Sequence, residues 1–112
     1  MTRLHHLALR VADLEKCREF YSDILGLPEI KRGDHSIWLR AGDLVLMLES
    51  RLRGVGPDAG SGHLLAFAAG DLGRWEKRLL DAGIPIDDRT PTTIYVRDPE
   101  GHRVGLSAYS LP

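Results

Sequence analysis

Two residues of this chain, His6 and Tyr95, have side chains suited to acid–base chemistry. A histidine ionises near neutral pH and can act as a general base, and a tyrosine hydroxyl can donate or accept a hydrogen bond. His6 is equally compatible with a hydrogen-bonded place in the core, and Tyr95 with an aromatic ring that fills a strand pair. The residue types alone leave both interpretations open.

Other side chains are suited to binding a ligand. Arg10 and Arg103 offer planar guanidinium groups to an anionic ligand, and Trp38 offers a ring on which an aromatic ligand can stack. Glu49 is a carboxylate of the kind that could hold a metal ion together with His6. Surface exposure of the arginines and core packing of the tryptophan are the simpler alternatives.

The composition argues against several other classes of protein. The chain has 112 residues, 43% of them apolar and 28% charged, as is usual for one globular domain. A net charge of -1 predicts no nucleic-acid partner, and the lack of a long apolar run predicts no membrane partner. With a single cysteine, Cys17, and no signal-peptide pattern, we expect a cytoplasmic protein.

The first half of the chain predicts a strand, a helix and three further strands. A strand-like run covers residues 4–11, and apolar residues at helical spacing follow Asp13, a suitable N-cap. Gly26 suits the position just after the helix. The three further strands are predicted at 28–31, 35–40 and 44–49.

The second half predicts the same order. A strand over 62–69 precedes a helix that begins after Asp71 and ends at Gly83. His102 follows a turn glycine and is expected to face solvent. The three further strands are predicted at 84–87, 92–97 and 102–110.

An internal repeat underlies this parallel order. A shift of 58 residues places His5 on His63 and Asp13 on Asp71. His5 and His63 are expected to face the side of the sheet opposite to His6, because strand side chains alternate. The fold class is therefore predicted to be α+β: a single domain, 1–112, with two tandem βαβββ modules at 1–50 and 62–112 and a glycine-rich linker at 51–61.

Three local sequences in this repeat resemble the vicinal oxygen chelate superfamily. They lie at 6–27, 95–103 and 65–72, and the last is most similar to the fosfomycin thiol transferases. The superfamily also includes glyoxalase I, bleomycin-resistance proteins and extradiol dioxygenases. The resemblance implies that the two modules form a concave mixed sheet with a site on its floor.

The resemblance also implies where metal ligands would lie. The family positions fall on His6, Met47, Leu64 and Gly105. Only the histidine among them is a suitable donor, because a thioether is soft and leucine and glycine have no donor atom. We therefore expect no metal at the family positions and no other cofactor. A divalent metal at a displaced site formed by His6 and Glu49 is the alternative.

Without polar ligands, the floor becomes apolar, and Gly105 is expected to leave open space there. Such a cavity favours an apolar or flat ligand oriented by a few polar groups. Tyr95 matches a tyrosine that contacts the substrate in fosfomycin thiol transferases. The residues expected to bind the ligand are Arg10, Trp38, Met47, Glu49, Leu64, Tyr95, Arg103 and Gly105.

Three functions are consistent with these residues. The first is metal-independent binding of a small organic molecule by a homodimer, in the manner of bleomycin-resistance proteins. The second is catalysis: either a metal-dependent lyase, thiol transferase or dioxygenase around His6 and Glu49, or metal-free acid–base catalysis by His6 and Tyr95. The third is a subunit whose groove has lost its ligand and serves assembly only.

Overall fold

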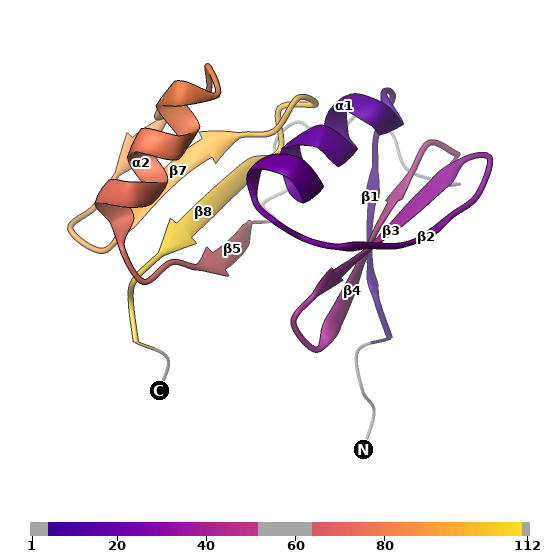
Figure 1. The fold of residues 1–112 in the computed structure, drawn as a ribbon, viewed down its shortest axis with the longest axis horizontal. Helices are drawn as coiled ribbons and strands as arrows, with labels where there is room; N and C mark the ends of the chain where they lie inside the picture. Colours follow the sequence, from indigo (N-terminus) through magenta and orange to yellow (C-terminus); the bar gives the residue numbers. More distant parts are fainter. Residues whose placement is uncertain (1–4, 52–63, 111–112) are drawn as a thin grey trace. The chain divides into compact units, whose positions relative to one another are not determined.

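Each half of the chain builds its own sheet and helical segment (Figure 1). The structure is a computed structural model that describes residues 5–51 and 64–110. The chain divides into two units, one ending at Asp58 and the other beginning at Ala59. The predicted α+β class is confirmed, because each unit has a four-stranded mixed sheet. The linker predicted at 51–61 lies outside the described residues except for Arg51, so the module boundaries stay predictions.

The sheet of the first unit has the strand order β1-β4-β3-β2. Strand β1 runs parallel to β4, and the other neighbours are antiparallel. The three strands predicted after the helix of this half are confirmed to within a residue at each end. The first strand is shorter than the predicted run of residues 4–11. The four strands are β1 (Leu7–Arg10), β2 (Glu29–Arg32), β3 (Ser36–Ala41) and β4 (Leu44–Glu49).

A helical segment in two parts connects β1 to β2. Helix α1 (Leu14–Arg18) is capped by Asp13, whose carboxylate accepts a hydrogen bond from the backbone N of Lys16 at 3.0 Å. The segment then widens into a π-helix, η1 (Glu19–Ile24), where a regular α-helix was predicted. Gly26 follows with a φ of 86°, as expected at a helix end.

The second unit has the equivalent strand order, β5-β8-β7-β6. Helix α2 (Leu72–Asp81) is capped by Asp71, as predicted. The strand predicted at 84–87 is wrong: β6 has only two residues and begins at 88, because Pro85 has no N–H to donate to a neighbouring strand. The strands are β5 (Leu65–Ala68), β6 (Asp88–Arg89), β7 (Thr93–Arg97) and β8 (Arg103–Ser107).

The strand register supports the internal repeat. Leu7 lies opposite Leu46 in the first unit, and a shift of 58 residues gives the pair of Leu65 and Val104 in the second. Because side chains alternate along a strand, each sheet has two faces. One face packs against the helical segment and contains the fully buried side chains Ile37, Leu39, Leu48, Val96, Val104 and Leu106. We call the other face of each sheet its site face.

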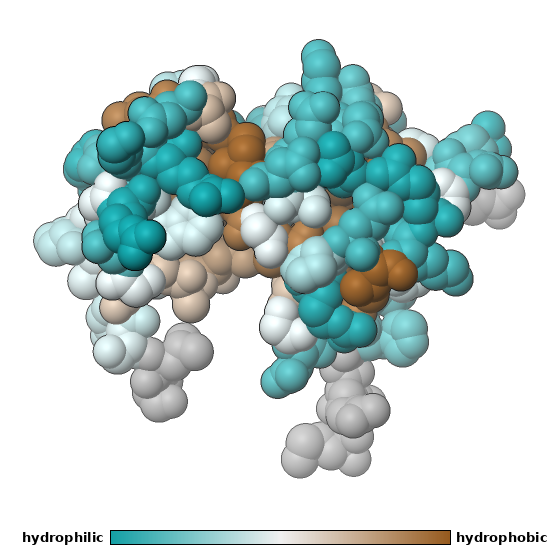
Figure 2. Space-filling view, in the orientation of Figure 1, coloured by the Kyte–Doolittle hydropathy of each residue, from teal (hydrophilic) through white to brown (hydrophobic). Residues whose placement is uncertain are grey.

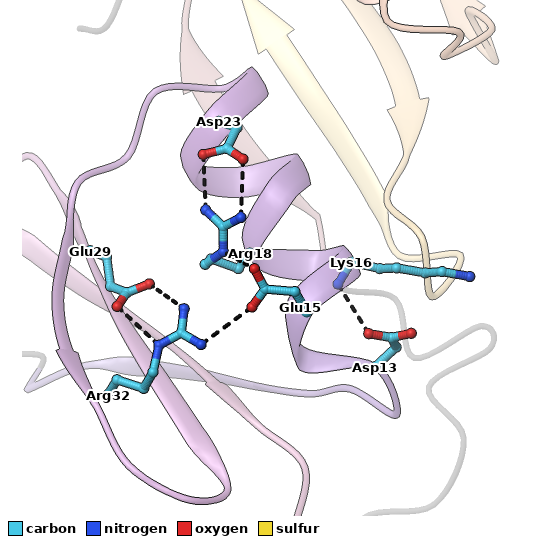
Figure 3. A network of polar contacts seen from close by, with 7 residues as sticks. All are labelled: Asp13, Glu15, Lys16, Arg18, Asp23, Glu29 and Arg32. Atoms are coloured by element: carbon cyan, nitrogen blue, oxygen red, sulfur yellow. Dashed lines mark hydrogen bonds and ion pairs between the residues drawn. The ribbon is translucent and has the colours of Figure 1, made fainter.

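A chain of ion pairs joins the helical segment to β2 (Figure 3). Arg18 pairs with Asp23 at 2.9 Å and with Glu15 at 2.6 Å, and Glu15 also pairs with Arg32 at 3.3 Å. Arg32 in turn donates to Glu29 at 2.7 Å, and these hydrogen bonds hold the pKa of Glu29 below its usual value. The Glu15 and Asp23 carboxylates are largely exposed, so we expect this network to orient the segment more than to stabilise the protein.

The exposed surfaces of both helical segments are mainly hydrophilic in Figure 2. On α2 the exposed polar residues include Arg74, Lys77 and Asp81. Within residues 5–51 and 64–110, no helix is long and apolar enough to cross a membrane.

Candidate functional site

The register of the first sheet brings two predicted site residues, Met47 and Trp38, into one row. Ala8 of β1 lies opposite Met47 of β4, Met47 lies opposite Trp38 of β3, and Trp38 lies opposite Lys31 of β2. Directly opposed residues of neighbouring strands point to the same face of a sheet. The row therefore belongs to the site face of the first unit.

The second sheet has an equivalent row. Ala66 of β5 lies opposite Gly105 of β8, Gly105 lies opposite Tyr95 of β7, and Tyr95 lies opposite Asp88 of β6. Tyr95 thus occupies the position that Trp38 has in the first unit. Each site face presents one aromatic ring at the same place in the repeat.

Trp38 lies in a cluster of rings and charge. The ring of His6 is 5.4 Å from that of Trp38, and the Lys31 Nζ atom is 5.7 Å from the tryptophan ring. His6 is half-buried, and its Nδ1 atom lies 2.8 Å from the Nδ1 atom of His5. Both histidines precede β1, so the strand alternation from which His5 was expected to face the opposite side does not apply to them, and His63 lies outside the described residues.

Tyr95 lies under a guanidinium that is fixed by carboxylates. The Arg103 guanidinium carbon is 4.5 Å from the centre of the Tyr95 ring. Arg103 donates to Asp88 at 3.2 Å, and its Nε atom is 3.6 Å from Asp87, which also pairs with Arg97 at 3.3 Å. Sequence reasoning missed both aspartates, although the register that places Asp88 opposite Tyr95 would have indicated one of them.

The ring of Tyr95 also covers Gly105. A Cβ atom on Gly105 would lie 3.4 Å from Cε1 of Tyr95 and 3.5 Å from Cγ2 of Thr93. The open space expected beside this glycine is therefore occupied by an aromatic ring. Next along the same face, the hydroxyls of Thr93 and Ser107 form a hydrogen bond of 2.8 Å.

Arg10 and Glu49 lie opposite each other in the β1–β4 register. Oε1 of Glu49 accepts a hydrogen bond from the backbone N of Arg51 at 2.8 Å. No ion pair joins Glu49 to Arg10, and the Arg10 guanidinium has no partner among the residues that the structure describes. Arg10 is therefore available to an outside anion, in contrast to Arg103.

The positions that the family resemblance assigns to metal ligands do not form a donor set. Leu64 is 46% exposed, Met47 is buried, and Gly105 is covered by Tyr95. In the part of the chain that the structure describes, no three His, Cys, Asp or Glu side chains come together as a metal-binding group. A catalytic divalent metal usually needs about three nitrogen or oxygen ligands, so these residues do not fit one.

Comparison with known proteins defines the family. Residues 3–106 match the Glyoxalase/Bleomycin resistance protein/Dioxygenase superfamily. The chain belongs to this superfamily. The similarity to fosfomycin-resistance members is also confirmed. The glutathione transferase FosA of Serratia marcescens is 32% identical over 115 residues, covering 96% of this chain and 82% of that protein.

Solved structures share the superfamily fold with this chain. An integron cassette protein of V. cholerae, VCH_CASS1, superimposes with a TM-score of 0.76 and is 29% identical, with 98% of this chain and 97% of that one covered. The fosfomycin resistance protein FosX from Mesorhizobium loti has a TM-score of 0.75 at 20% identity, covering 99% and 94%. The latter likeness supports the fold alone.

A second polar cluster lies in the turn between β7 and β8. The fully buried Asp98 carboxylate accepts hydrogen bonds from the backbone N of Glu100 at 2.9 Å and of His102 at 2.8 Å. Its other oxygen lies 2.7 Å from Nδ1 of His102. The His102 side chain is only 12% exposed, so the expectation that it faces solvent is wrong. The cluster fixes the turn that aligns Tyr95 with Gly105.

A surface hollow of about 720 Å³ lies beside α2. It is on the helix side of the second unit, whereas Tyr95 and Gly105 lie on the site face. The hollow is therefore separate from the predicted site. Its lining residues are Gly70, Asp71, Arg74, Trp75, Lys77, Arg78 and Asp81.

Proposed function

We propose that this chain binds a small organic molecule on the site faces of its sheets, without a metal ion. The observation that supports this most is the donor set: Met47, Leu64 and Gly105 stand where the resemblance assigns ligands, leaving only His6. The same faces present aromatic rings with cations beside them. Such surroundings suit a flat ligand that a few polar groups orient.

Trp38 is the expected platform for the ligand. Its side chain is half-buried, so part of the ring remains accessible, and Met47 beside it adds apolar surface. Tyr95 is half-buried as well, but Arg103 stacks on its ring at 4.5 Å, closer than Lys31 lies to the ring of Trp38 at 5.7 Å. We therefore expect Trp38, on the site face of the first unit, to supply most of the stacking energy.

A metal-dependent enzyme is the second candidate function. The likeness to FosA, which is named a glutathione transferase, favours it. A lyase, thiol transferase or dioxygenase of this kind would use His6 and Glu49 as a displaced metal site. Oε1 of Glu49 accepts a hydrogen bond from the backbone N of Arg51, so Oε2 would be the oxygen offered to the metal.

A homodimer in the cytoplasm is part of the proposal. Strands β1 and β2 are the edges of the first sheet, and β5 and β6 those of the second. Edge strands present unpaired backbone groups, which a partner subunit can cover. The oligomeric state can be measured by sedimentation equilibrium.

Fluorescence of Trp38 tests the proposed binding. Trp75→Phe leaves Trp38 as the only tryptophan, because the chain has two. We expect members of a panel of planar arenes and small phosphonates to quench this fluorescence and to raise Tm by several degrees, as a ligand specific for the folded state does. Trp38→Leu should abolish the Tm shift, and Arg74→Gln, on α2, should retain it.

Two outcomes would contradict the proposal. One is that no compound of the panel changes the fluorescence of Trp38 or the Tm of the protein. The other is a ligand-induced Tm shift that survives in Trp38→Leu, since the ligand would then bind elsewhere, for example in the hollow beside α2.

A further inference from the structure

We infer that the ligand of this site is an aromatic anion, and that Arg10 is the residue that selects for its charge. The inference rests on the proposed function, because it names the class of molecule that the site face of the first unit would bind. It comes from a difference between the two site faces, which the internal repeat would otherwise make alike.

The site face of the first unit has an excess of positive charge. Three of its described strand residues are cationic, Arg10, Lys31 and Arg40, and one is a carboxylate, Glu49. The strand register places these residues on the same face as Met47 and Trp38. The Glu49 carboxylate is already a hydrogen-bond acceptor for Arg51. An anionic ligand would therefore meet a favourable field at this face.

The site face of the second unit balances its own charge. Arg103 pairs with Asp87 and Asp88, and Arg97 pairs with Asp87. Arg103 also stacks on Tyr95. A ligand anion would have to compete with two carboxylates for this guanidinium. We therefore expect Arg103 to contribute little to the selection of an anionic ligand.

Arg10 differs from Arg103 in that no described carboxylate pairs with its guanidinium. It is half-buried on β1, and no described residue pairs with its guanidinium. A partly desolvated guanidinium binds an anion more strongly than a fully solvated one, and its planar fork matches the two oxygens of a carboxylate. Arg10 is therefore the side chain in the first unit best placed to bind a ligand carboxylate.

The distance between Arg10 and Trp38 sets the shape of the ligand. Their strands, β1 and β3, are separated by β4, and Arg10 lies two residues further along than the row that contains Trp38. Standard strand spacing and rise place the two Cα atoms about 12 Å apart. An arene stacked on Trp38 with a carboxylate at its edge lies within reach of the extended arginine side chain.

A matched pair of probes tests the inference. We expect 2-naphthoate to quench Trp38 in the Trp75→Phe protein and neutral 2-naphthamide, which has the same shape, to bind about tenfold more weakly. Arg10→Gln should weaken 2-naphthoate about tenfold and leave 2-naphthamide unchanged. Arg74→Gln removes the same charge from α2 and should alter neither. Added salt should weaken the binding of naphthoate only.

The outcomes separate this inference from the proposed function. If the amide binds as tightly as the carboxylate, or if Arg10→Gln binds naphthoate like the parent, the inference is wrong and the binding function stands. If neither naphthalene binds but an uncharged arene of the panel does, the ligand class is again wrong. If no arene or phosphonate binds at all, both proposals fail.

Discussion

Gly105→Glu is expected to lower the free energy of unfolding by about 3 kcal/mol and Tm by about 10–20 °C. The Tyr95 ring lies 3.4 Å from the place of a Cβ atom at Gly105, so we expect the atoms of a longer side chain to press against that ring. Tyr95 in turn supports Arg103, which stacks on it at 4.5 Å. The substitution would therefore place a carboxylate in a buried position and disturb the ion pairs of Arg103 with Asp87 and Asp88. Urea unfolding and a thermal melt measure the loss.

Gly105→Ala is the matched control for this prediction. Its Cβ atom would make ordinary contacts with Tyr95 and Thr93, and Gly105 has no positive φ that would strain it. We expect alanine to change the free energy of unfolding by less than about 1 kcal/mol. Gly105→Gln separates the steric effect of Gly105→Glu from the effect of its charge, because glutamine and glutamate have side chains of similar size. A Gly105→Glu protein that melts with the parent would show that Tyr95 does not cover this position.

Asp98→Ala is expected to cost about 2–3 kcal/mol of stability. The carboxylate accepts from the backbone N atoms of Glu100 and His102 and contacts the His102 ring, and its side chain is fully buried. Alanine would remove the shared acceptor of these part-buried groups. Urea unfolding monitored by circular dichroism provides the measurement.

Two further variants separate the parts of the Asp98 cluster. Asp98→Asn keeps an oxygen for the backbone N–H groups and should lose less stability than alanine. His102→Ala removes the ring contact with Asp98 but keeps the carboxylate and its backbone hydrogen bonds, and we expect it to cost about 1 kcal/mol of stability. Equal stability of Asp98→Ala and the parent would contradict the buried role of this carboxylate.

Local features of the fold were predictable because their causes are local. The caps Asp13 and Asp71 accept from an amide three residues ahead, and Gly26 and Gly83 have the positive φ that a helix end favours. Trp38 and Met47, both named from the sequence as ligand-binding residues, lie opposite each other in the strand register. These features depend on residue type and spacing within a few positions.

The details of the site depend on contacts between distant residues. The pairing of Arg103 with Asp87 and Asp88 follows from the short β6 and its register with β7, which the sequence pattern placed several residues too early. The His5–His6 contact follows from the exact start of β1. A shift of one residue in a strand reverses the direction of every side chain, so such contacts require the register itself.

The central claim is that this chain binds its ligand without a metal. The most direct measurement determines the metal content of the untagged protein and then the arene-induced Tm shift with EDTA and with added Mn²⁺, Zn²⁺ or Ni²⁺. We predict less than stoichiometric metal, a ligand-induced shift that EDTA leaves unchanged, and no stabilisation by any of the three ions. About one metal ion per chain, a rise of several degrees on adding one of the ions, or loss of the ligand-induced shift in EDTA would contradict the claim.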